Sequence, residues 1–422
     1  MNDDAAQTYY VASAERGQTY PSLTGMLQAD LCIVGAGYTG LCAAIHAANA
    51  GARTVLLESH SVGFGASGRN GGQIHSGHRQ DQKTLEMWLG IDRARDLWRI
   101  AEDGKALVRA LAAENCDLKS GLLNAAHDED ALRKLEVETE HLHGYYGYGE
   151  AKVLSAEAVA KAVGSAAYRG GQFDGGGGHL HPLKYARSLA RAAASAGAMI
   201  RENSQVLDLT ESATGIAVRT AFGNVRADKV IVACDAFIGA VLPELASYIG
   251  HVESFITATE PLTPELDAAI LPTDWAIADT RHVLDYYRKS NDGRVLFAGR
   301  ESYWFPPKDI AALVRPRMLR VFPALKSTRT EFAWSGTVSI TRTRMPHFGR
   351  SGSRILFGHG YSGHGVALAT IGGKLLAAAA LTKSDGFDVL ASVPAEPFPG
   401  PQWTRKSLIA AALLWYKLED LV

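Results

Sequence analysis

A glycine-rich turn near the start of the sequence carries the clearest chemical signal. It reads Gly35-Ala36-Gly37-Tyr38-Thr39-Gly40, and an acidic residue, Glu58, follows about 20 residues further on. Glycines let the backbone approach a pyrophosphate closely, and a helix that begins there stabilises the negative charge with free N–H groups. The carboxylate of Glu58 is placed to bind a ribose hydroxyl. This spacing predicts a dinucleotide-binding site, but it does not separate a flavin from a nicotinamide cofactor.

A second glycine-rich segment follows closely and reads Gly63-Phe64-Gly65-Ala66-Ser67-Gly68-Arg69-Asn70-Gly71-Gly72-Gln73. Glycines interspersed with Ser67, Arg69 and Asn70 make a loop that can surround an anion and bring its backbone against a flat ring. The same composition also fits a flexible loop. The pattern alone therefore leaves a cofactor-binding role and a structural role open.

Ring side chains are candidates for proton transfer or substrate contact. The histidines of interest are His75, His78, His179, His181 and His364. The aromatic candidates lie in the second half of the chain and are Tyr286, Tyr287, Tyr303, Trp304 and Trp334. A structural hydrogen bond is the alternative for each histidine, and core packing is the alternative for each aromatic residue. No single catalytic base can be assigned from these patterns.

Apolar periodicity predicts the elements that position these residues. The runs at 31–34 and 54–57 flank a stretch with helical spacing, so residues 30–58 form a βαβ unit. Short β-type runs follow between 199 and 233, and further strands are expected between 250 and 345. The expected helices are 81–111, 128–145, 182–196 and 366–381. The glycine-rich stretch 168–181 shows no periodicity and predicts a loop.

These elements predict an α/β fold whose second domain is α+β. The first, Rossmann-like domain is expected from residues 1–80, 150–245 and 345–400, and the second, with a mixed or antiparallel sheet, from 81–149 and 246–344. Residues 401–422 form a helical tail. Each domain is therefore built from several passes of the chain.

Three segments give the sequence a specific resemblance. The stretch Gly65–Gln73 is similar to the flavin-contacting segment of γ-glutamylputrescine oxidases and their relatives in the D-amino-acid oxidase/glycine oxidase superfamily. Gly178–Leu183 and Gly360–Val366 match the same proteins, and the resemblance spans nearly the whole chain. It implies a two-domain fold of the glutathione-reductase type, FAD as cofactor and oxidation of an amine.

The resemblance also implies which residues contact FAD. Gly35, Gly37 and Gly40 would hold the pyrophosphate with Tyr38 and Thr39, Glu58 and Ser59 would lie at the adenosine ribose, and Val206 would meet the adenine. The residues along the pyrophosphate and isoalloxazine would be Ala66, Ser67, Arg69, Asn70, Gly71, Gly72 and Gln73. Those that cap the pyrimidine edge of the flavin would be Tyr361, Ser362, Gly363, His364, Gly365 and Val366. Some relatives bind flavin covalently through histidine or cysteine, whereas here Ala66-Ser67 occupies the histidine region and no cysteine follows Cys234. Non-covalent FAD is therefore expected, without a metal.

The expected reaction converts an amine such as γ-glutamylputrescine to an imine and then an aldehyde, with O2 reduced to hydrogen peroxide. Candidates for a catalytic role are Gln73, His75, Tyr286, Trp334 and His364. Amino-acid oxidases of the superfamily place a carboxylate-binding arginine after a W-x-G segment, but here Val338 follows Trp334-Ser335-Gly336-Thr337. Losing that anchor argues against simple α-amino acids, although Arg342 or Arg344 is an alternative anchor.

An alternative is an imino-acid dehydrogenase, acting for example on L-pipecolate, that passes electrons to the respiratory chain. The apolar tail segment 407–416 motivates it, because such a segment can lie on a membrane surface. A non-catalytic protein that uses FAD for structure is a third possibility.

Composition excludes some of the remaining classes of protein function. The chain has 422 residues, is 47% hydrophobic and carries a formal net charge of −1, without the basic surface that a nucleic-acid-binding protein needs. Its four cysteines form no C-x-x-C pair, and residues 1–7 lack the features of a secretory signal. A cytoplasmic enzyme with a small-molecule amine substrate is expected, and its oligomeric state stays open.

Overall fold

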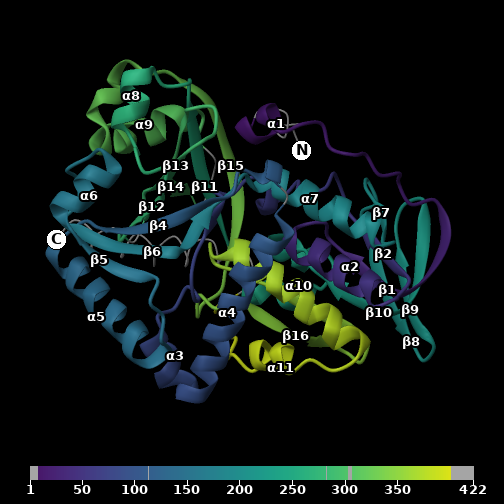
Figure 1. The fold of residues 1–422 in the computed structure, drawn as a ribbon. Coiled ribbons are helices and arrows are strands. Elements are labelled where there is room, and N and C mark those ends of the chain that lie inside the picture. Colours follow the sequence, from purple (N-terminus) through teal and green to yellow (C-terminus); the bar gives the residue numbers. More distant parts are fainter. Residues whose placement is uncertain (1–7, 113, 282, 303–306, 401–422) are drawn as a thin grey trace.

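The computed structural model describes residues 8–112, 114–281, 283–302 and 307–400. Within these residues the chain forms two β-sheets with helices packed on them (Figure 1). The helices are α1 (Tyr9–Ser13), α2 (Tyr38–Asn49), α3 (Gln82–Leu89), α4 (Ile91–Leu111), α5 (Glu129–Tyr146), α6 (Ala156–Val163), α7 (Pro182–Ser195), α8 (Pro264–Ala269), α9 (Ile310–Val321), α10 (Gly365–Leu381) and α11 (Asp385–Ala391). The expected helix over 81–111 is divided into α3 and α4 at Gly90, which has a φ of +80°.

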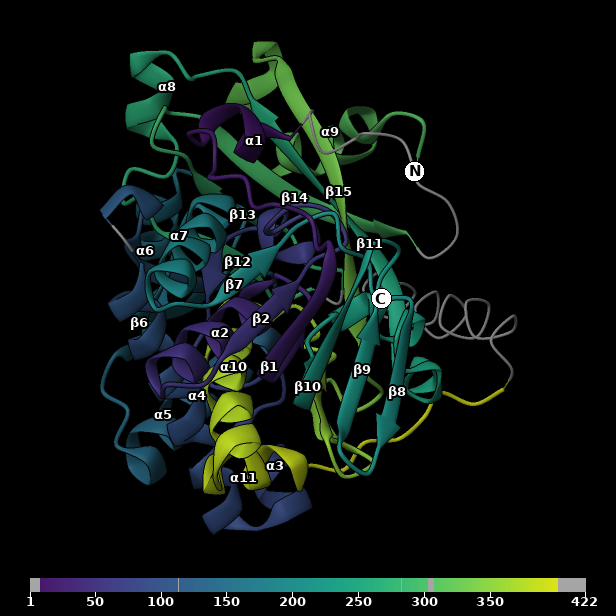
Figure 2. The ribbon, with the colours of Figure 1, turned by 90° about the vertical axis from the view of Figure 1, so that its right-hand side faces the viewer.

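The first sheet has a parallel centre. Its strands run in the order β16, β17, β10, β1, β2 and β7, and neighbours from β17 to β7 pair in parallel. An antiparallel pair, β8 and β9, extends from β10 (Figure 2). The strands are β1 (Gly25–Val34), β2 (Thr54–Leu57), β7 (Met199–Arg201), β8 (Asp208–Ser212), β9 (Gly215–Arg219), β10 (Gly223–Val232), β16 (His347–Ser351) and β17 (Ile355–His359).

The predicted βαβ unit over residues 30–58 is confirmed. The buried end of β1, Leu31 to Val34, pairs in parallel with β2, and α2 connects the two strands. Both strand segments are buried on both faces, which explains why their sequences are continuous apolar runs rather than alternating ones. This unit fixes the glycine turn between β1 and α2 at the carboxyl end of a central strand.

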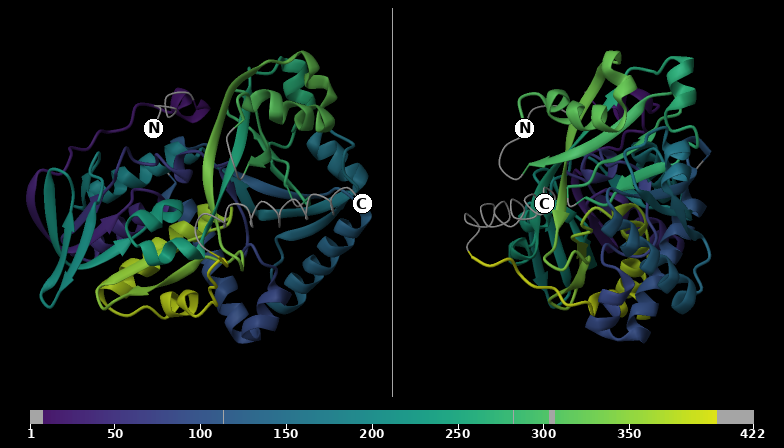
Figure 3. Two further views of the ribbon diagram at one scale, coloured as in Figure 1. Left: turned by 180° about the vertical axis from the view of Figure 1, so that it is seen from behind. Right: turned by 90° about the vertical axis from the view of Figure 1, so that its left-hand side faces the viewer.

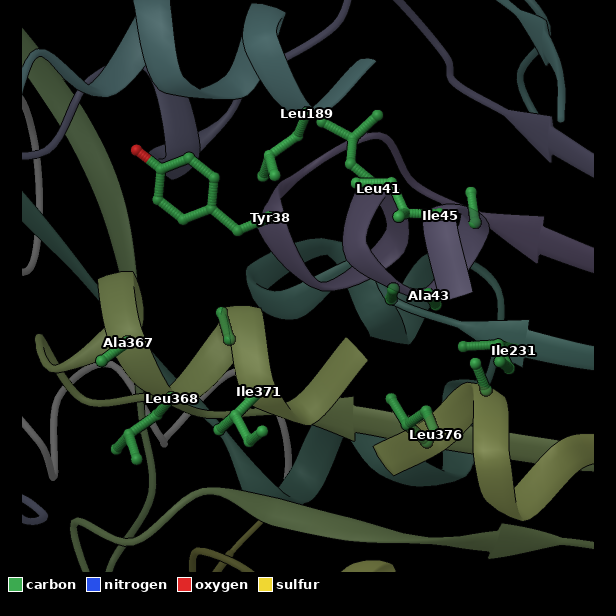
Figure 4. Close-up of a cluster of buried hydrophobic side chains, with 14 of the residues drawn as sticks. Tyr38, Leu41, Ala43, Ile45, Leu189, Ile231, Ala367, Leu368, Ile371 and Leu376 are labelled. Carbon is green, nitrogen blue, oxygen red and sulfur yellow. The ribbon is translucent and has the colours of Figure 1, made fainter. Parts of the chain in front are cut away.

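Helix α10 completes the core of this part of the molecule. It packs against α2 and α4, and α2 packs in turn against α7. Figure 4 shows the buried cluster, with Leu41 and Ile45 of α2, Leu189 of α7 and Ile371 of α10. Each such side chain stabilises the fold by about 2 kcal/mol on burial. No single helix in the described residues is long and apolar enough to cross a membrane, and α10 and α11 pass that test only as a pair bent by 113°.

The second sheet is mainly antiparallel. Its order is β15, β11, β14, β13, β12, β4, β6 and β3, with β5 also paired to β6, and only β12 and β4 pair in parallel within it. In Figure 3 the light-green strand β15 stands between the two parts of the molecule. The strands are β3 (Gln73–Ile74), β4 (Lys119–Ala126), β5 (Ala151–Ser155), β6 (Gly170–His179), β11 (Gly250–Thr259), β12 (Ala276–Asp279), β13 (Tyr286–Lys289), β14 (Val295–Ser302) and β15 (Thr330–Ile340).

The prediction of a loop over residues 168–181 is wrong, because most of this stretch is strand β6. It pairs with β3, β4 and β5 despite its run of glycines. A Cβ on Gly178 would lie 2.2 Å from the Lys119 carbonyl oxygen, and one on Gly176 would lie 2.2 Å from the Tyr148 hydroxyl. Glycine disfavours strands by itself, but here close neighbours exclude any larger residue.

The pairing of β3, β5 and β6 also bears on the expected domain division. That division assigned residues 1–80 and 150–245 to the first domain, whereas these three strands belong to the second sheet. The misplacement has the same physical origin as the missed strand, since β5 and β3 are recognisable only as partners of β6. The division into a cofactor domain and a substrate domain otherwise stays a prediction.

Candidate active site at the carboxyl ends of the parallel strands

The predicted cofactor residues gather at one edge of the first sheet. Gly35 follows β1, Glu58 follows β2, Asp235 lies just beyond β10 and Gly360 follows β17. These four strands are parallel neighbours, so their carboxyl ends lie side by side. Open α/β sheets bind ligands in the crevice at this edge.

The first glycine turn is shaped by close backbone contacts. Gly35 has a φ of +105°, and a Cβ there would lie 2.6 Å from the Ala233 carbonyl oxygen. A Cβ on Gly40 would lie 1.9 Å from the Gly35 carbonyl oxygen. Glu58 stabilises the turn, because its Oε2 accepts a 2.8 Å hydrogen bond from the Ala36 amide. The glycines therefore bring the backbone close together at the N-terminus of α2, where a Cβ on Gly37 would lie 2.9 Å from Ser67 Oγ.

The segment from Ala66 to Gln73 is joined to this turn. Ser67 Oγ accepts a 3.0 Å hydrogen bond from the Tyr38 amide, and Asn70 Nδ2 donates to the Tyr38 hydroxyl at 3.2 Å. The Asn70 side chain also accepts from the Gly72 amide at 2.7 Å, and Gly72 has a φ of +77°. This second segment is therefore an ordered wall of the site rather than a flexible loop.

The segment from Tyr361 to Val366 reaches the same crevice. The hydroxyls of Tyr361 and Thr39 lie 2.7 Å apart, which ties this segment to the start of α2. Ser362 has a φ of +51°, and Gly363 has a φ of +91° with nothing within 4 Å of the position of a Cβ. Non-glycine residues held in this conformation occur preferentially at functional sites. The N-terminus of α10 thus faces open space beside the glycine turns.

Among the candidate histidines, His75 and His364 come together. Their rings lie 4.3 Å apart between centroids, one ring following β3 and the other preceding α10. The other three are bound elsewhere: His78 to the Leu97 carbonyl, His179 to the Asp274 carbonyl, and His181 at the start of α7 as its N-cap. The structure therefore reduces five candidates to one pair.

Both imidazoles of this pair favour the uncharged form. Burial, together with the positive charge of Arg79, lowers the pKa of His75 to about 4, although Asp174 opposes this shift. Burial and the neighbouring His75 hold the pKa of His364 well below its usual range. Both rings therefore stay uncharged at neutral pH.

Two of the aromatic candidates touch the second glycine segment. Trp334 Nε1 donates to the Arg69 carbonyl at 3.0 Å, and a Cβ on Gly71 would lie 2.6 Å from the Tyr286 ring. Tyr286 and Gln73 line a small cavity there, while the Gln73 amide donates to the Ile277 carbonyl at 2.8 Å. Tyr287 instead stacks on Phe297 in the core. Tyr303 and Trp304 lie outside the described residues.

The remaining predicted residues have distinct positions. Val206 is buried close to the end of β2, because the Ser204 amide donates to the Glu58 carbonyl. Ser59 is exposed beside Glu58, its hydroxyl donating to that carboxylate. Arg342 is exposed and pairs with Glu396 at 2.7 Å, so this pairing removes it as the expected carboxylate anchor, while Arg344 has a φ of +59° in the same loop.

Sequence reasoning missed two residues that organise the site. Asp235 Oδ1 accepts from the Ser339 hydroxyl at 2.5 Å and from the Gly360 amide at 2.9 Å, which joins the segment after β10 to strand β15 and to the segment after β17. Arg288 is 3% exposed and its Nε donates to the Gly71 carbonyl at 2.7 Å. No local pattern reveals these roles, because the partners are distant in sequence.

The residues present fit FAD. A carboxylate suited to a ribose lies at the end of β2, and the glycine turn beside it leads into the N-terminus of α2, which is suited to a pyrophosphate. Further along the same edge, the Nδ1 atom of His364 is buried without a hydrogen-bond partner among the described residues. A buried polar atom of this kind is normally satisfied by a ligand or water. The assignment of each residue to a part of the cofactor stays a prediction.

Comparison with known proteins identifies the family. A family model described as FAD dependent oxidoreductase matches residues 30–379. The chain is 37% identical over 98% of its length to γ-glutamylputrescine oxidoreductase of Escherichia coli K12, and the match covers 98% of that protein. It is 24% identical to glycine oxidase of Bacillus licheniformis, over 82% of this chain and 92% of that one.

A solved structure supports the fold. Glycine oxidase from Geobacillus kaustophilus superimposes with a TM-score of 0.71 at 20% sequence identity, covering 83% of this chain and 94% of the other. The predicted FAD-binding fold and the predicted cofactor are confirmed by these matches. The chain is an enzyme that belongs to the family of FAD-dependent oxidoreductases typified by D-amino-acid oxidase and glycine oxidase.

Proposed function

We propose that this enzyme oxidises the terminal primary amine of a small polyamine conjugate of the γ-glutamylputrescine type, with O2 as electron acceptor. The name of the Escherichia coli relative, similar over nearly the full chain, supports the substrate class. The observation that carries the proposal is the uncharged pair His75 and His364 at the strand ends, close to the segment that Tyr286 and Trp334 contact. Such a site favours a neutral amine over an ammonium ion.

In this proposal the three glycine-rich segments hold FAD without a covalent bond. Gly35 to Gly40 bind the pyrophosphate and Glu58 the ribose, while residues 66–73 and 361–366 surround the isoalloxazine. Burial raises the pKa of the Cys234 thiol to about 12, so this cysteine lacks the thiolate needed for attachment. The non-covalent state is tested by acid precipitation, which then leaves all FAD in the supernatant.

The chain's own residues prepare the amine. Removing a proton from an alkylammonium of pKa ~10 at neutral pH costs about 4 kcal/mol. This proton leaves to solvent, the uncharged rings of His75 and His364 surround the neutral amine without adding charge, and Tyr286 and Trp334 exclude water and orient the carbon chain. Bound FAD supplies the acceptor for the hydride that leaves the carbon next to nitrogen. The product imine adds water to give an aldehyde and ammonia, and O2 takes up two electrons and two protons to form hydrogen peroxide.

The alternative of a membrane-linked imino-acid dehydrogenase gains no support. It depended on the tail segment 407–416, which lies outside the described residues. The relative that is 37% identical over nearly the full chain is named a γ-glutamylputrescine oxidoreductase, which supports the proposed amine substrate instead.

The decisive experiment is anaerobic titration of the purified yellow protein with γ-glutamylputrescine, putrescine, sarcosine and L-pipecolate, followed at the flavin absorption band. The proposal expects bleaching by γ-glutamylputrescine, and equimolar hydrogen peroxide after O2 is admitted. Bleaching by L-pipecolate alone would contradict the proposed substrate class and favour an imino acid as substrate. Bleaching by γ-glutamylputrescine without peroxide formation would contradict O2 as the electron acceptor.

A further inference from the structure

A buried polar cluster lies behind the segment from Gln73 to Ser76. Its centre is Lys105 of α4, whose side chain is 4% exposed. The Nζ atom donates to Ser76 Oγ at 2.5 Å and to the Tyr148 hydroxyl at 2.9 Å, and it pairs with Glu102 at 2.8 Å. An ammonium group has three hydrogens, so all of them are used inside the protein.

Asp174 of β6 supplies the opposing charge. Its carboxylate accepts hydrogen bonds from the Ser76 and Tyr148 hydroxyls and a 2.9 Å bond from the Gly176 amide, and its side chain is 5% exposed. The two hydroxyls therefore stand between the ammonium and the carboxylate. Burying a charged pair is unfavourable unless hydrogen bonds satisfy it, and apolar side chains would hold α4 on the sheet as firmly. A role beyond stability is therefore the better explanation for this cluster.

The cluster is connected directly to the candidate active site. Ser76 follows His75 in the chain, and Gln73 lies one short strand earlier, where β3 pairs with β6 through Gln73 and His179. Lys105 donates a hydrogen bond to Ser76, and the Ser76 hydroxyl in turn donates one to Asp174 of β6. A displacement of the ammonium would therefore move both the segment that carries His75 and the strand that positions Gln73.

The glycines of β6 make this arrangement possible. A Cβ on Gly176 would lie 2.2 Å from the Tyr148 hydroxyl and 3.0 Å from Lys105 Nζ. Arg109, one turn further along α4, donates to the Gly176 and Gly177 carbonyls at 2.6 and 3.1 Å. Helix α4 thus holds the glycine run at two points while Lys105 reaches past it to Ser76.

We propose that Lys105 is a positioning residue of the reaction, which fixes Gln73 and His75 at the flavin and substrate through Ser76 and Asp174. The inference rests on the proposed function, because that function places Gln73 and His75 at the reacting groups. Lys105 itself touches neither substrate nor cofactor. Its effect should therefore appear in the environment of the flavin and in turnover, with little change in whether FAD is retained.

The test compares Lys105→Met with wild type in the FAD-loaded full-length enzyme. The visible circular dichroism of the flavin and its reduction potential are measured without any substrate, and kcat and KM are measured with γ-glutamylputrescine. The expected result is retained FAD, an altered flavin dichroism spectrum and a kcat reduced at least tenfold with a smaller change in KM. Lys105→Met/Asp174→Asn, which removes the ammonium and the carboxylate that the two hydroxyls connect and leaves Glu102 in place, should recover part of the spectrum and rate.

Glu86→Gln is the matched control. Glu86 is a half-buried carboxylate of α3 that accepts from Tyr146 at 2.6 Å and from His141 at 2.8 Å, away from residues 73–76. The Glu86→Gln substitution should lower the melting temperature of the protein without changing the circular dichroism spectrum of the flavin. If Lys105→Met does not fold, Ser76→Ala, which removes one hydroxyl, should give the same spectral change in weaker form.

An unchanged flavin spectrum and potential in Lys105→Met, or in Ser76→Ala where only that variant folds, would overturn the inference even if stability is lost. These spectra do not depend on the identity of the amine. A wild-type enzyme that γ-glutamylputrescine fails to reduce would instead overturn the proposed function, so the two failures are distinguishable.

Discussion

Two glycine-rich segments of this protein have similar composition and opposite structural roles. The turn Gly35–Gly40 lies between β1 and α2, and its glycines let the backbone pack closely at the N-terminus of α2. The run Gly175–Gly178 lies within β6, where the missing side chains leave room for Tyr148, Lys105 and the neighbouring strand. In the proposed complex the first segment exposes its backbone to FAD, whereas the second makes room for the protein's own buried charges.

The difference shows that a glycine run has no structural meaning apart from its neighbours. At Gly40 the nearest atom to an added Cβ is the Gly35 carbonyl oxygen at 1.9 Å, within the same turn. At Gly176 it is the Tyr148 hydroxyl, which belongs to another element. A contact within the turn therefore requires glycine at position 40, whereas a contact with another element requires it at position 176.

Gly40→Ala tests the first segment and should have the largest effect. The added methyl group cannot be accommodated against the Gly35 carbonyl, so the turn must open and the pyrophosphate site is lost. We expect the protein to purify without FAD or in much reduced yield. The 450 nm absorbance per unit of protein measures this directly. If the variant retained a full equivalent of FAD, this result would contradict the cofactor-binding role assigned to the turn.

Gly176→Ala tests the second segment and should destabilise the fold while leaving FAD bound. Overpacking of a buried site typically costs 1–3 kcal/mol, and the added methyl group meets the Tyr148 hydroxyl. Urea denaturation followed by far-ultraviolet circular dichroism measures the change. Gly144→Ala in α5 is the control, because its Cβ would meet nothing within 4 Å, and it should stabilise by up to about 1 kcal/mol. Equal effects of both substitutions would contradict the role assigned to Gly176.

The end of β6 should also make stability depend on pH. Burial, together with Arg288, lowers the pKa of His179 to about 3, so the folded protein leaves it uncharged while the unfolded chain protonates it near its usual value of 6.5. The unfolded state then binds more protons below pH 6.5, and stability falls as pH falls toward 3. This histidine contributes up to about 1.4 kcal/mol per pH unit. His179→Gln should reduce the slope of unfolding free energy between pH 6.5 and 5, and an unchanged slope would exclude it as the source.

Glu58→Gln tests how much a single carboxylate beside the first segment contributes to FAD affinity. Its expected effect is the smallest of the four. The carboxylate accepts from the Ala36 and His60 amides, and in the proposed complex it also binds the ribose. An amide retains one acceptor and loses the charge, so we expect the FAD dissociation constant to rise about tenfold, which corresponds to about 1.4 kcal/mol. Isothermal titration of the apoprotein with FAD measures it. An unaltered affinity would argue that backbone contacts alone hold this end of the cofactor.

What could be predicted from sequence follows the same division. The unit over residues 30–58 is read from local spacing, because its strands, turn and helix are consecutive. The pairing of His75 with His364 could not be predicted, although both residues were candidates, since only the fold brings β3 to the start of α10. Lys105 resembled any charged residue of a surface helix, and its burial depends on Tyr148 and Asp174 from distant elements.

The order of strands in the first sheet has a consequence for how the enzyme is made. Strand β1, near the start of the chain, pairs with β10, and β10 pairs with β17, which directly precedes the Tyr361–Val366 segment and α10. A ribosome-bound chain therefore lacks one wall of the proposed cofactor site until residues 361–366 have been synthesised. The proposed FAD site is complete only after these residues emerge, and the face of α2 that α10 covers stays uncovered until α10 can pack on it.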